Sequence, residues 1–424
     1  MTARILGNML LPLIFCANTV YPQTVTVEEC FKKARVNYPL IKQLNLIEKA
    51  REYNMDNLQK TFLPQVAVTA QASWQTDVMT LPVNIPGIPS ISRGQYRATA
   101  DISQTVWDGG TIKSQKALTV ASSNVELQNI EVEMYAIAEQ ICNLYFGTLL
   151  TDEQMKQIDI LRENLEVSLN SARSMHKNGT ALASDIDLLN VEILNTVQRK
   201  TELIHLKSAY TEMLSALINE PLAEFSLVRS VNEFPDLQNT VLSRPEMLMF
   251  ERQISLIDAR ENMIKSKSRP RLSLFVQGGY GRPGLNMLSD NFDFWGIGGV
   301  RMSWFLGNLY TKRNEKRIVS IDREKIMNRE ETLKFNINRQ LVQIRNEIDS
   351  YGKLMESDRE IIALREKVRT ASEKKYSSGI CTVNDLIKDI NVENFARQNR
   401  AIHETLYLMS IYKYKNVSGT INFE

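Results

Sequence analysis

The sequence has few of the residues that build metal sites and disulfide frameworks. Its 424 residues include only four cysteines and three histidines. The cysteines lie far apart and lack the spacing of metal ligands; they are Cys16, Cys30, Cys142 and Cys381. One disulfide is compatible with this arrangement, but a disulfide framework is not. The sequence therefore predicts no metal site and no cofactor.

Charge of one sign and long apolar runs are also scarce. The net charge is +2, and acidic and basic residues alternate without a long block of either sign. This pattern gives no indication of nucleic-acid binding or of a polybasic membrane arm. Beyond the N-terminal segment there is no apolar stretch long enough for a transmembrane helix.

The N-terminal segment has the pattern of an export signal. Arg4 provides a basic start, residues 9–17 are apolar, and a small-residue cleavage site follows at 17–19. We therefore expect residues 1–22 to be a signal peptide. Phe15 is too bulky for the residue that precedes a lipidated cysteine, so we do not expect Cys16 to carry lipid. The alternative is a buried N-terminal helix.

Catalytic motifs are absent from the sequence. There is no phosphate-binding loop, serine-nucleophile elbow or His-Glu-x-x-His motif. The glycine-rich stretches 278–281 and 296–299 lie inside alternating segments, where glycine favours curvature or close strand packing. Asp185 and Asp385 stand where helices are expected to begin, and aspartate commonly caps such helices. The sequence therefore predicts that the protein is not an enzyme.

What the sequence does contain is one structural plan described twice, about two hundred residues apart. A repeat this long indicates duplication of a large unit and not a solenoid. We expect a first repeat at 23–225 and a second at 226–424, each with a helix, two strands and a long helical hairpin. The matching features are Pro39 and Pro245, Pro64 and Pro270, Trp107 and Trp304, Gly179 and Gly379, Asp185 and Asp385, and Asn-Val-Glu at 190–192 and 391–393.

Four segments alternate apolar and polar residues with a period of two, as strands with two different faces do. They span 65–76, 95–107, 271–281 and 293–305. Each is about ten residues long, which is the length that a tilted strand needs to cross a bilayer. In the second segment the alternation places Val106 on the apolar face. The residues expected to face lipid include Val66, Val68, Trp74, Ile102, Leu274, Val300 and Trp304.

A soluble sandwich with one buried face is the alternative for any single segment. All four tryptophans fall within the four segments, as in the aromatic girdles of membrane barrels. Together with export and matched strand lengths, this placement favours a membrane barrel. Four strands are too few to close such a barrel, so several chains must contribute. The segments 77–94 and 282–292 are then expected to be extracellular loops.

The remaining sequence predicts helices of unusual length. Residues 110–177 and 310–378 contain no proline, and at 1.5 Å per residue each stretch would extend roughly 100 Å. Apolar residues recur every three or four positions from Met155 to Met175, as in coiled-coil packing. Each long helix is expected to end at a short turn with Gly179 or Gly379, after which a second helix returns.

The order of these elements, given twice, resembles the TolC family of outer-membrane efflux channels over nearly the whole chain after the export signal. Thr105 and Ser303 stand where the family often has proline, and the second strand-to-helix turn lacks Asp-Gly-Gly. The motifs that carry the resemblance are Thr26-Val27-Glu28-Glu29-Cys30 with Asn37-Tyr38-Pro39, Phe62-Leu63-Pro64, Val106-Trp107-Asp108-Gly109-Gly110, and Tyr376-Ser377-Ser378-Gly379 with Asn384-Asp385-Leu386.

The resemblance implies a mixed α and β membrane protein, in which a long α-helical barrel continues into a transmembrane β-barrel. Each chain of a homotrimer would give four strands to a shared barrel of twelve. The resemblance also implies residence in the outer membrane of a Gram-negative bacterium, contact with its lipid, a periplasmic adaptor, and an inner-membrane pump of the RND or ABC type. The implied function is export of small molecules. A type I protein secretion conduit and a secreted coiled-coil protein without a pore are the alternatives.

The resemblance further implies two sites near the hairpin turns. Asp385 matches the first of two acidic positions that line the entrance of the channel in this family. Lys388 occupies the second, with Asp389 displaced by one residue, so we expect a single ring of carboxylates, bridged to Lys388. The alternative is that Asp385 only caps its helix. The residues expected to contact the adaptor are Gly179, Thr180, Leu182, Gly379, Ile380 and Thr382.

Overall fold

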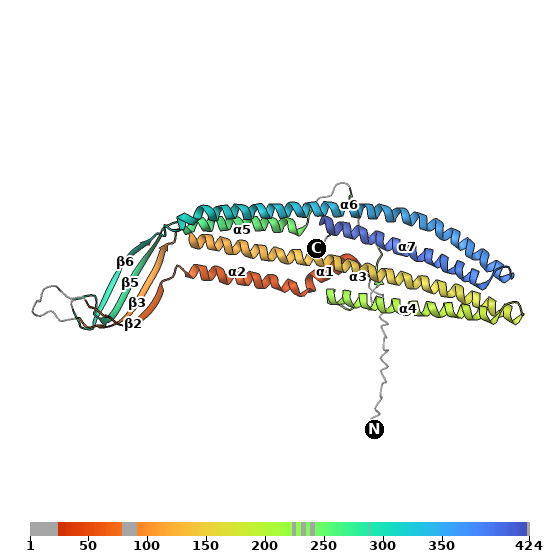
Figure 1. The fold of residues 1–424 in the computed structure, drawn as a ribbon, viewed down its shortest axis with the longest axis horizontal. Helices are drawn as coiled ribbons and strands as arrows, with labels where there is room; N and C mark the ends of the chain where they lie inside the picture. The colour runs from red at the N-terminus through yellow and green to blue at the C-terminus, as the bar shows by residue number, and fades with distance from the viewer. Residues whose placement is uncertain are drawn as a thin grey trace, which may run out of the picture.

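The computed structural model describes residues 24–78, 91–222, 226–229, 235–237, 242–287 and 289–421. The expected export signal, with Cys16, lies outside these residues, as does the 79–90 part of the first expected loop. The described chain is strongly elongated. Its main sheet forms one end, and the helices run from there toward two hairpin turns at the other end (Figure 1).

The first half begins with the expected capping box. The Thr26 hydroxyl accepts a hydrogen bond from the Glu29 amide at 3.2 Å, and the Glu29 carboxylate accepts one from the Thr26 amide at 2.8 Å. Pro39 then interrupts the first helix, as expected. In chain order the elements are β1 (Thr24–Val25), α1 (Val27–Asn37), the 3-10 turn η1 (Pro39–Ile41), α2 (Lys42–Lys60), β2 (Gln65–Trp74), β3 (Gly94–Trp107), α3 (Thr111–Lys177) and α4 (Ala183–Ile218).

The second half repeats the order of a helix, two strands, a long helix and a returning helix. Its elements are β4 (Ser226–Leu227), α5 (Pro245–Lys267), β5 (Arg271–Arg282), β6 (Asp293–Ser303), α6 (Asn308–Ser377) and α7 (Val383–Ser418). The short strands β1 and β4 pair in parallel and join the two halves near the middle of the molecule. The opening helix, the two strands and the helical hairpin expected in each half are therefore present, with ends within a few residues of the expected ones.

One of the matched sequence features is not structurally equivalent. α4 and α7 both contain 36 residues, and their first and last residues differ in number by 200. The Asn-Val-Glu motif recurs at an offset of 201, from 190–192 to 391–393. One residue corresponds to about 100° of rotation around a helix, so the two motifs point in different directions. Glu393 is 2% exposed, whereas Glu192 is half-buried.

The four long strands form one antiparallel sheet in the order β2-β3-β5-β6. Val66 pairs with Ile102 and Ile102 pairs with Val276, which fixes the register across the first three strands. β6 ends at Ser303, two residues before the expected end. β2 and β6 are the outer strands of this sheet.

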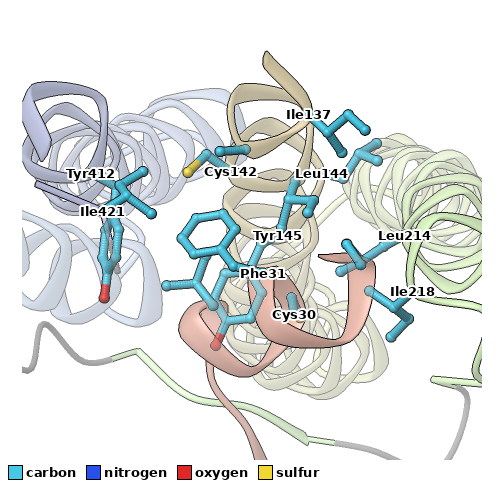
Figure 2. Close-up of a cluster of buried hydrophobic side chains, with 14 of the residues drawn as sticks. Cys30, Phe31, Ile137, Cys142, Leu144, Tyr145, Leu214, Ile218, Tyr412 and Ile421 are labelled. Carbon is cyan, nitrogen blue, oxygen red and sulfur yellow. The ribbon is translucent and has the colours of Figure 1, made fainter. Parts of the chain in front are cut away.

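The helices pack around α3, which lies between α2, α4, α5 and α7, whereas α6 packs against α5 and α7 at one edge (Figure 1). The largest buried cluster lies where α1 meets α3, α4 and α7. Figure 2 shows Phe31, Tyr145 and Tyr412 converging there from three helices. A second cluster near the turns joins Leu165 of α3, Leu189 of α4 and Leu386 of α7. The chain therefore has its own apolar core along the helices, but not at the sheet.

Within the part of the chain that the structure describes, no helix combines the length and the apolar character needed to cross a membrane.

Candidate functional site

One face of the sheet is apolar and exposed. Residues that pair directly across strands project from the same face, as do residues two apart on one strand. Val68 is 79% exposed and Trp74 is 75% exposed, which is far above the exposure of core side chains. The expected lipid-facing residues that the pairing places on this face are Val66, Val68, Trp74, Ile102, Leu274 and Val300.

A β-bulge changes the face expected for the end of β3. Thr105 pairs with Ser273, but the next pair joins Trp107 to Leu272, so Val106 is the extra residue. Trp107 therefore lies on the apolar face, to which Leu272 also belongs. Strict alternation from Thr105 would place Trp107 on the polar face, because it cannot anticipate an inserted residue.

Trp304, also expected to face lipid, lies just beyond the end of β6. Its indole N–H donates to the Ser268 carbonyl at 3.1 Å, which ties the junction of β6 and α6 to the end of α5. Half of the Trp304 side chain stays exposed. An indole anchored by its N–H with an exposed ring is typical of the boundary between lipid and water.

Aromatic side chains gather at the other end of the apolar face. The rings of Tyr280 and Phe294 lie 4.5 Å apart, and Phe292 stacks against both Tyr280 and Tyr96. With Trp74 they form a band at the end of the strands that is far from the helices. Trp107 and Trp304 mark the end near the helices. The exposed apolar surface is therefore bounded at both ends by aromatic residues.

The opposite face of the sheet is largely polar. It carries Thr69, Arg97, Asp101, Gln277 and Arg301, which are placed by the same pairing. The Asp101 carboxylate accepts a hydrogen bond from the Thr99 hydroxyl at 3.2 Å. A sheet with one apolar and one polar face, both open, can separate lipid from water.

The two strand-to-helix junctions differ. At the first, Asp108 is buried and its carboxylate accepts hydrogen bonds from the amides of Gly110, at 2.9 Å, and Ile112. Gly109 and Gly110 have φ of +70° and +85°, and a Cβ on Gly109 would meet Arg269 at 2.8 Å. At the second junction, α6 begins without a side-chain cap.

The hairpin turns satisfy their own backbone. The Thr180 amide donates to the Met175 carbonyl at 2.9 Å, and the Ile380 amide donates to the Lys375 carbonyl at 2.8 Å. Gly179 and Gly379 take φ near +75° and have no atom within 4 Å of an added Cβ. Leu182 and Ile380 are 68% and 74% exposed. The turns therefore end in uncovered apolar side chains, at positions expected to contact an adaptor.

Asp385 forms a complete capping box with Thr382. The Thr382 hydroxyl accepts from the Asp385 amide at 3.2 Å, and the Asp385 carboxylate accepts from the Thr382 hydroxyl and amide at 2.6 and 3.1 Å. These hydrogen bonds hold the pKa of the Asp385 carboxyl below its usual range. The carboxyl stays exposed and is therefore charged as well as engaged in the cap.

The three residues expected at the gate do not act as one cluster within the chain. Asp389 accepts a hydrogen bond from Ser372 of α6 and so points back toward the neighbouring helix. Lys388 is exposed and forms no ion pair with Asp385 or Asp389 within 4 Å. Of the three, Asp385 and Lys388 are the exposed charges near the turn.

A buried charge network behind the turn was missed by the sequence analysis. The Glu393 carboxylate accepts from Arg369 of α6 at 2.5 Å and from Arg397 at 2.8 Å, and Arg369 also pairs with Glu373. This joins α6 to α7. The sequence does contain a signal for this network, because arginines stand 24 residues before Glu393 and four residues after it. The sequence analysis used Glu393 only as part of a repeated motif. No cluster of metal-ligating residues occurs among the residues that the structure describes.

Solved structures that share this architecture are outer-membrane channels. The channel OprN superposes with a TM-score of 0.66 over 93% of this chain and 89% of its own, at 15% identity. The Campylobacter jejuni CmeC channel gives 0.62 over 93% and 85%, at 14% identity. The open state of the Neisseria gonorrhoeae MtrE channel gives 0.63 over 94% and 90%, at 13% identity.

This chain has the fold of an outer-membrane channel. The likeness covers 93–94% of this chain and 85–90% of each of these channels. It confirms the architecture that the resemblance to the TolC family implies: long helical hairpins joined to strands that belong to a β-barrel. Comparison with protein-family models and with curated protein sequences finds no match. The similarity to these channels is therefore detected in the three-dimensional structure and not in the sequence.

Proposed function

We propose that this chain is the outer-membrane exit duct of a tripartite efflux system, which exports small molecules out of the cell. The observation that carries the proposal is the sheet. One face exposes large apolar side chains along its whole length, between aromatic bands, and the other face is polar. Exposed apolar surface of this extent marks contact with lipid or protein. The fold shared with outer-membrane channels makes lipid the fitting contact.

The proposal includes a homotrimer. Within the described sheet, β2 and β6 each leave one edge without a strand partner. Unpaired strand edges in lipid are costly, so β2 of one copy would pair with β6 of the next, closing twelve strands around a lumen. The exposed apolar side chains along α6 would be covered in the same assembly; they include Phe335, Val342, Ile361, Leu364 and Val368.

The turns are proposed to contact a periplasmic adaptor, which links the duct to an inner-membrane pump. Leu182 and Ile380 support this because both are apolar and uncovered at the end of the molecule. Cysteines introduced at Thr180 and Thr382 should crosslink to the adaptor in whole cells. Cys381 is replaced in every variant, because its free thiol lies beside Thr382. The matched control is a cysteine at Thr201, which is exposed in the middle of α4, far from the turn. Crosslinks that join only copies of this chain would contradict the assignment.

The narrow entrance is proposed to be lined by Asp385 from each copy. Its carboxylate is exposed and charged, and Lys388 lies one helical turn farther on. A ring of carboxylates favours cations over anions. The capping box described above is compatible with this role, because an exposed capping carboxylate keeps its charge.

The test of the channel is its location and its conductance. The protein should fractionate with the outer membrane, and the purified assembly should form pores in a planar lipid bilayer. Protein found in the medium, with no conductance, would instead support a secreted coiled-coil protein. The neighbouring genes would separate drug efflux from protein secretion, since the two differ in the pump.

A further inference from the structure

Two aromatic side chains occupy the polar face of the sheet. Phe275 of β5 and Trp295 of β6 share this face with Arg97 and Arg301, because their strand pairs place them there. Alternation alone would assign polar residues to both positions. Under the proposed function this face lines the lumen, so both rings would stand where exported compounds pass.

Each ring lies across from a glycine. Trp295 pairs directly with Gly279, and a Cβ on Gly279 would come within 2.5 Å of the indole. Phe275 pairs directly with Gly299, where an added Cβ would lie 3.3 Å from the ring. An aromatic side chain that lies over a cross-strand glycine covers the bare backbone. The two rings therefore lie along the wall and do not fill the lumen.

An arginine guanidinium also lies near each ring. The Arg301 guanidinium lies 4.4 Å from the centre of the Phe275 ring, and the Arg97 guanidinium lies 6.0 Å from the centre of the Trp295 ring. Both arginines are exposed. Neither forms an ion pair with any residue that the structure describes. The polar face thus presents two matched units, each made of a glycine, a ring and a guanidinium.

The chemistry of these units fits one class of compound. The guanidinium group is planar, so it can hold a carboxylate or sulfonate through two parallel hydrogen bonds. The part of the ring that the glycine and the guanidinium leave exposed can contact a second flat ring, edge to face or offset. A compound with both features, a flat ring and an attached anion, would use both parts of the unit.

We propose that the units Gly299–Phe275–Arg301 and Gly279–Trp295–Arg97 form binding stations for aromatic anions inside the barrel. The proposal rests on the proposed function, since it requires the polar face to line a lumen. Three copies would place two successive rings of such stations along the exit path. If the rings only covered glycine, the arginines would be replaceable without effect on any compound in the lumen.

The test uses the purified assembly in a planar bilayer, with naphthalene-2-sulfonate as the probe and cyclohexanesulfonate as the non-aromatic control. The aromatic anion should block conductance at lower concentration than the control. Arg301→Gln and Arg97→Gln combined should weaken the block about tenfold, the loss expected for one charge-assisted interaction at each station. Each single variant should weaken it by less, because the other station remains. Arg301→Lys, which keeps the charge without the flat group, should weaken it by less than Arg301→Gln.

The matched control is Arg271→Gln. Arg271 is exposed on the same face, opposite Ser303, and no aromatic ring of the described residues lies next to its guanidinium. This variant should leave the block within about twofold of the original, because general charge contributes little at physiological salt. An equal loss in Arg271→Gln and Arg301→Gln, or no loss in either, would overturn the proposal.

A second measurement does not depend on conduction. Binding of the probe should change the tryptophan fluorescence of the purified assembly, and Trp295→Phe should remove most of that change. If no pore forms, the proposed duct fails and the stations fail with it, and a fluorescence change that needs Arg97 would then show only that the sheet binds the probe. If pores form and the fluorescence does not respond to the probe, the station at Trp295 is wrong and the duct stands.

Discussion

The two ends of the molecule differ in whether one chain covers its own apolar surface and pairs its own backbone. At the sheet end, the apolar face has no covering within the chain, and side chains such as Val68 and Trp74 are mostly exposed. At the turn end, the backbone is closed by glycine turns and, in the second hairpin, by the capping box of Thr382 and Asp385. A buried cluster around Leu165 and Leu386 lies directly behind the turns. The sheet end therefore depends on its surroundings, whereas the turn end is complete within one chain.

The difference indicates which part of the structure depends on association with other molecules. Long helices with an internal core can form before any copy meets another. The sheet cannot, because it lacks both a covered face and paired edges. We expect substitutions at the sheet to act on insertion and assembly, and substitutions at the turns to act on conduction and partner contact.

The largest effect is expected from charge on the apolar face. Val68→Arg should reduce the assembled protein strongly, because a cation on the lipid face near the middle of a bilayer costs about 2–4 kcal/mol. Thr69→Arg is the matched control, one residue away on the polar face. The amount of heat-resistant oligomer in the membrane fraction measures both. Equal loss in the two variants would break the distinction between the faces.

An intermediate effect is expected at the first strand-to-helix junction. Asp108→Ala leaves two amides at the start of α3 without their acceptor, which should destabilise the protein by about 1–2 kcal/mol. Asn308→Ala at the second junction removes one exposed hydrogen bond, to the Lys267 carbonyl. It should cost about 0.5 kcal/mol or less. Denaturant unfolding of both variants gives the comparison; similar losses would show that the junctions are equivalent.

The smallest effect on stability is expected at the turn end. Asp385→Asn keeps the cap, because asparagine caps a helix nearly as well as aspartate. It removes the charge, so cation selectivity and block by polyvalent cations should fall while the unfolding transition stays in place. Unchanged selectivity in single-channel recordings would leave Asp385 with a capping role alone.

The pH dependence of this site follows from the lowered pKa of Asp385. A carboxyl whose pKa is depressed in the folded state contributes above its ordinary pKa and loses that contribution as pH falls through the folded value. Both the cap and the charge should therefore persist as the pH drops to the ordinary value of 3.8. Selectivity that disappears well above that pH would contradict the capping geometry.

The elements were predictable where a local pattern determines them. Alternation located the four strands, and glycine after a long proline-free stretch located both turns. The bulge at Val106 was not predictable. Val106 and Trp107 are both apolar, so the sequence does not indicate which of them pairs with Leu272. The placement of Trp295 depends on Gly279, a residue on another strand. Only the register between strands reveals that pair.

The candidate site was predictable in its residues more than in its contacts. Asp385 could be placed at a helix start from sequence, but its bond to the Thr382 hydroxyl and the turn of Asp389 toward Ser372 need the geometry of two helices. The burial of Glu393 was not predictable either. It depends on the direction in which this residue projects from α7, and the repeated motif gives the wrong direction because it is displaced by one residue between the two halves.

The equal lengths of α4 and α7 have a consequence for how such a chain can change over generations. Both helices contain 36 residues, and their turns lie together at one end (Figure 1). Losing seven residues from both helices of one hairpin would withdraw its turn by roughly 10 Å and leave the other turn protruding. Insertions and deletions in the two halves should therefore be inherited as matched sets. The two repeats would then have to keep equal hairpin lengths during evolution, even after their sequences have diverged.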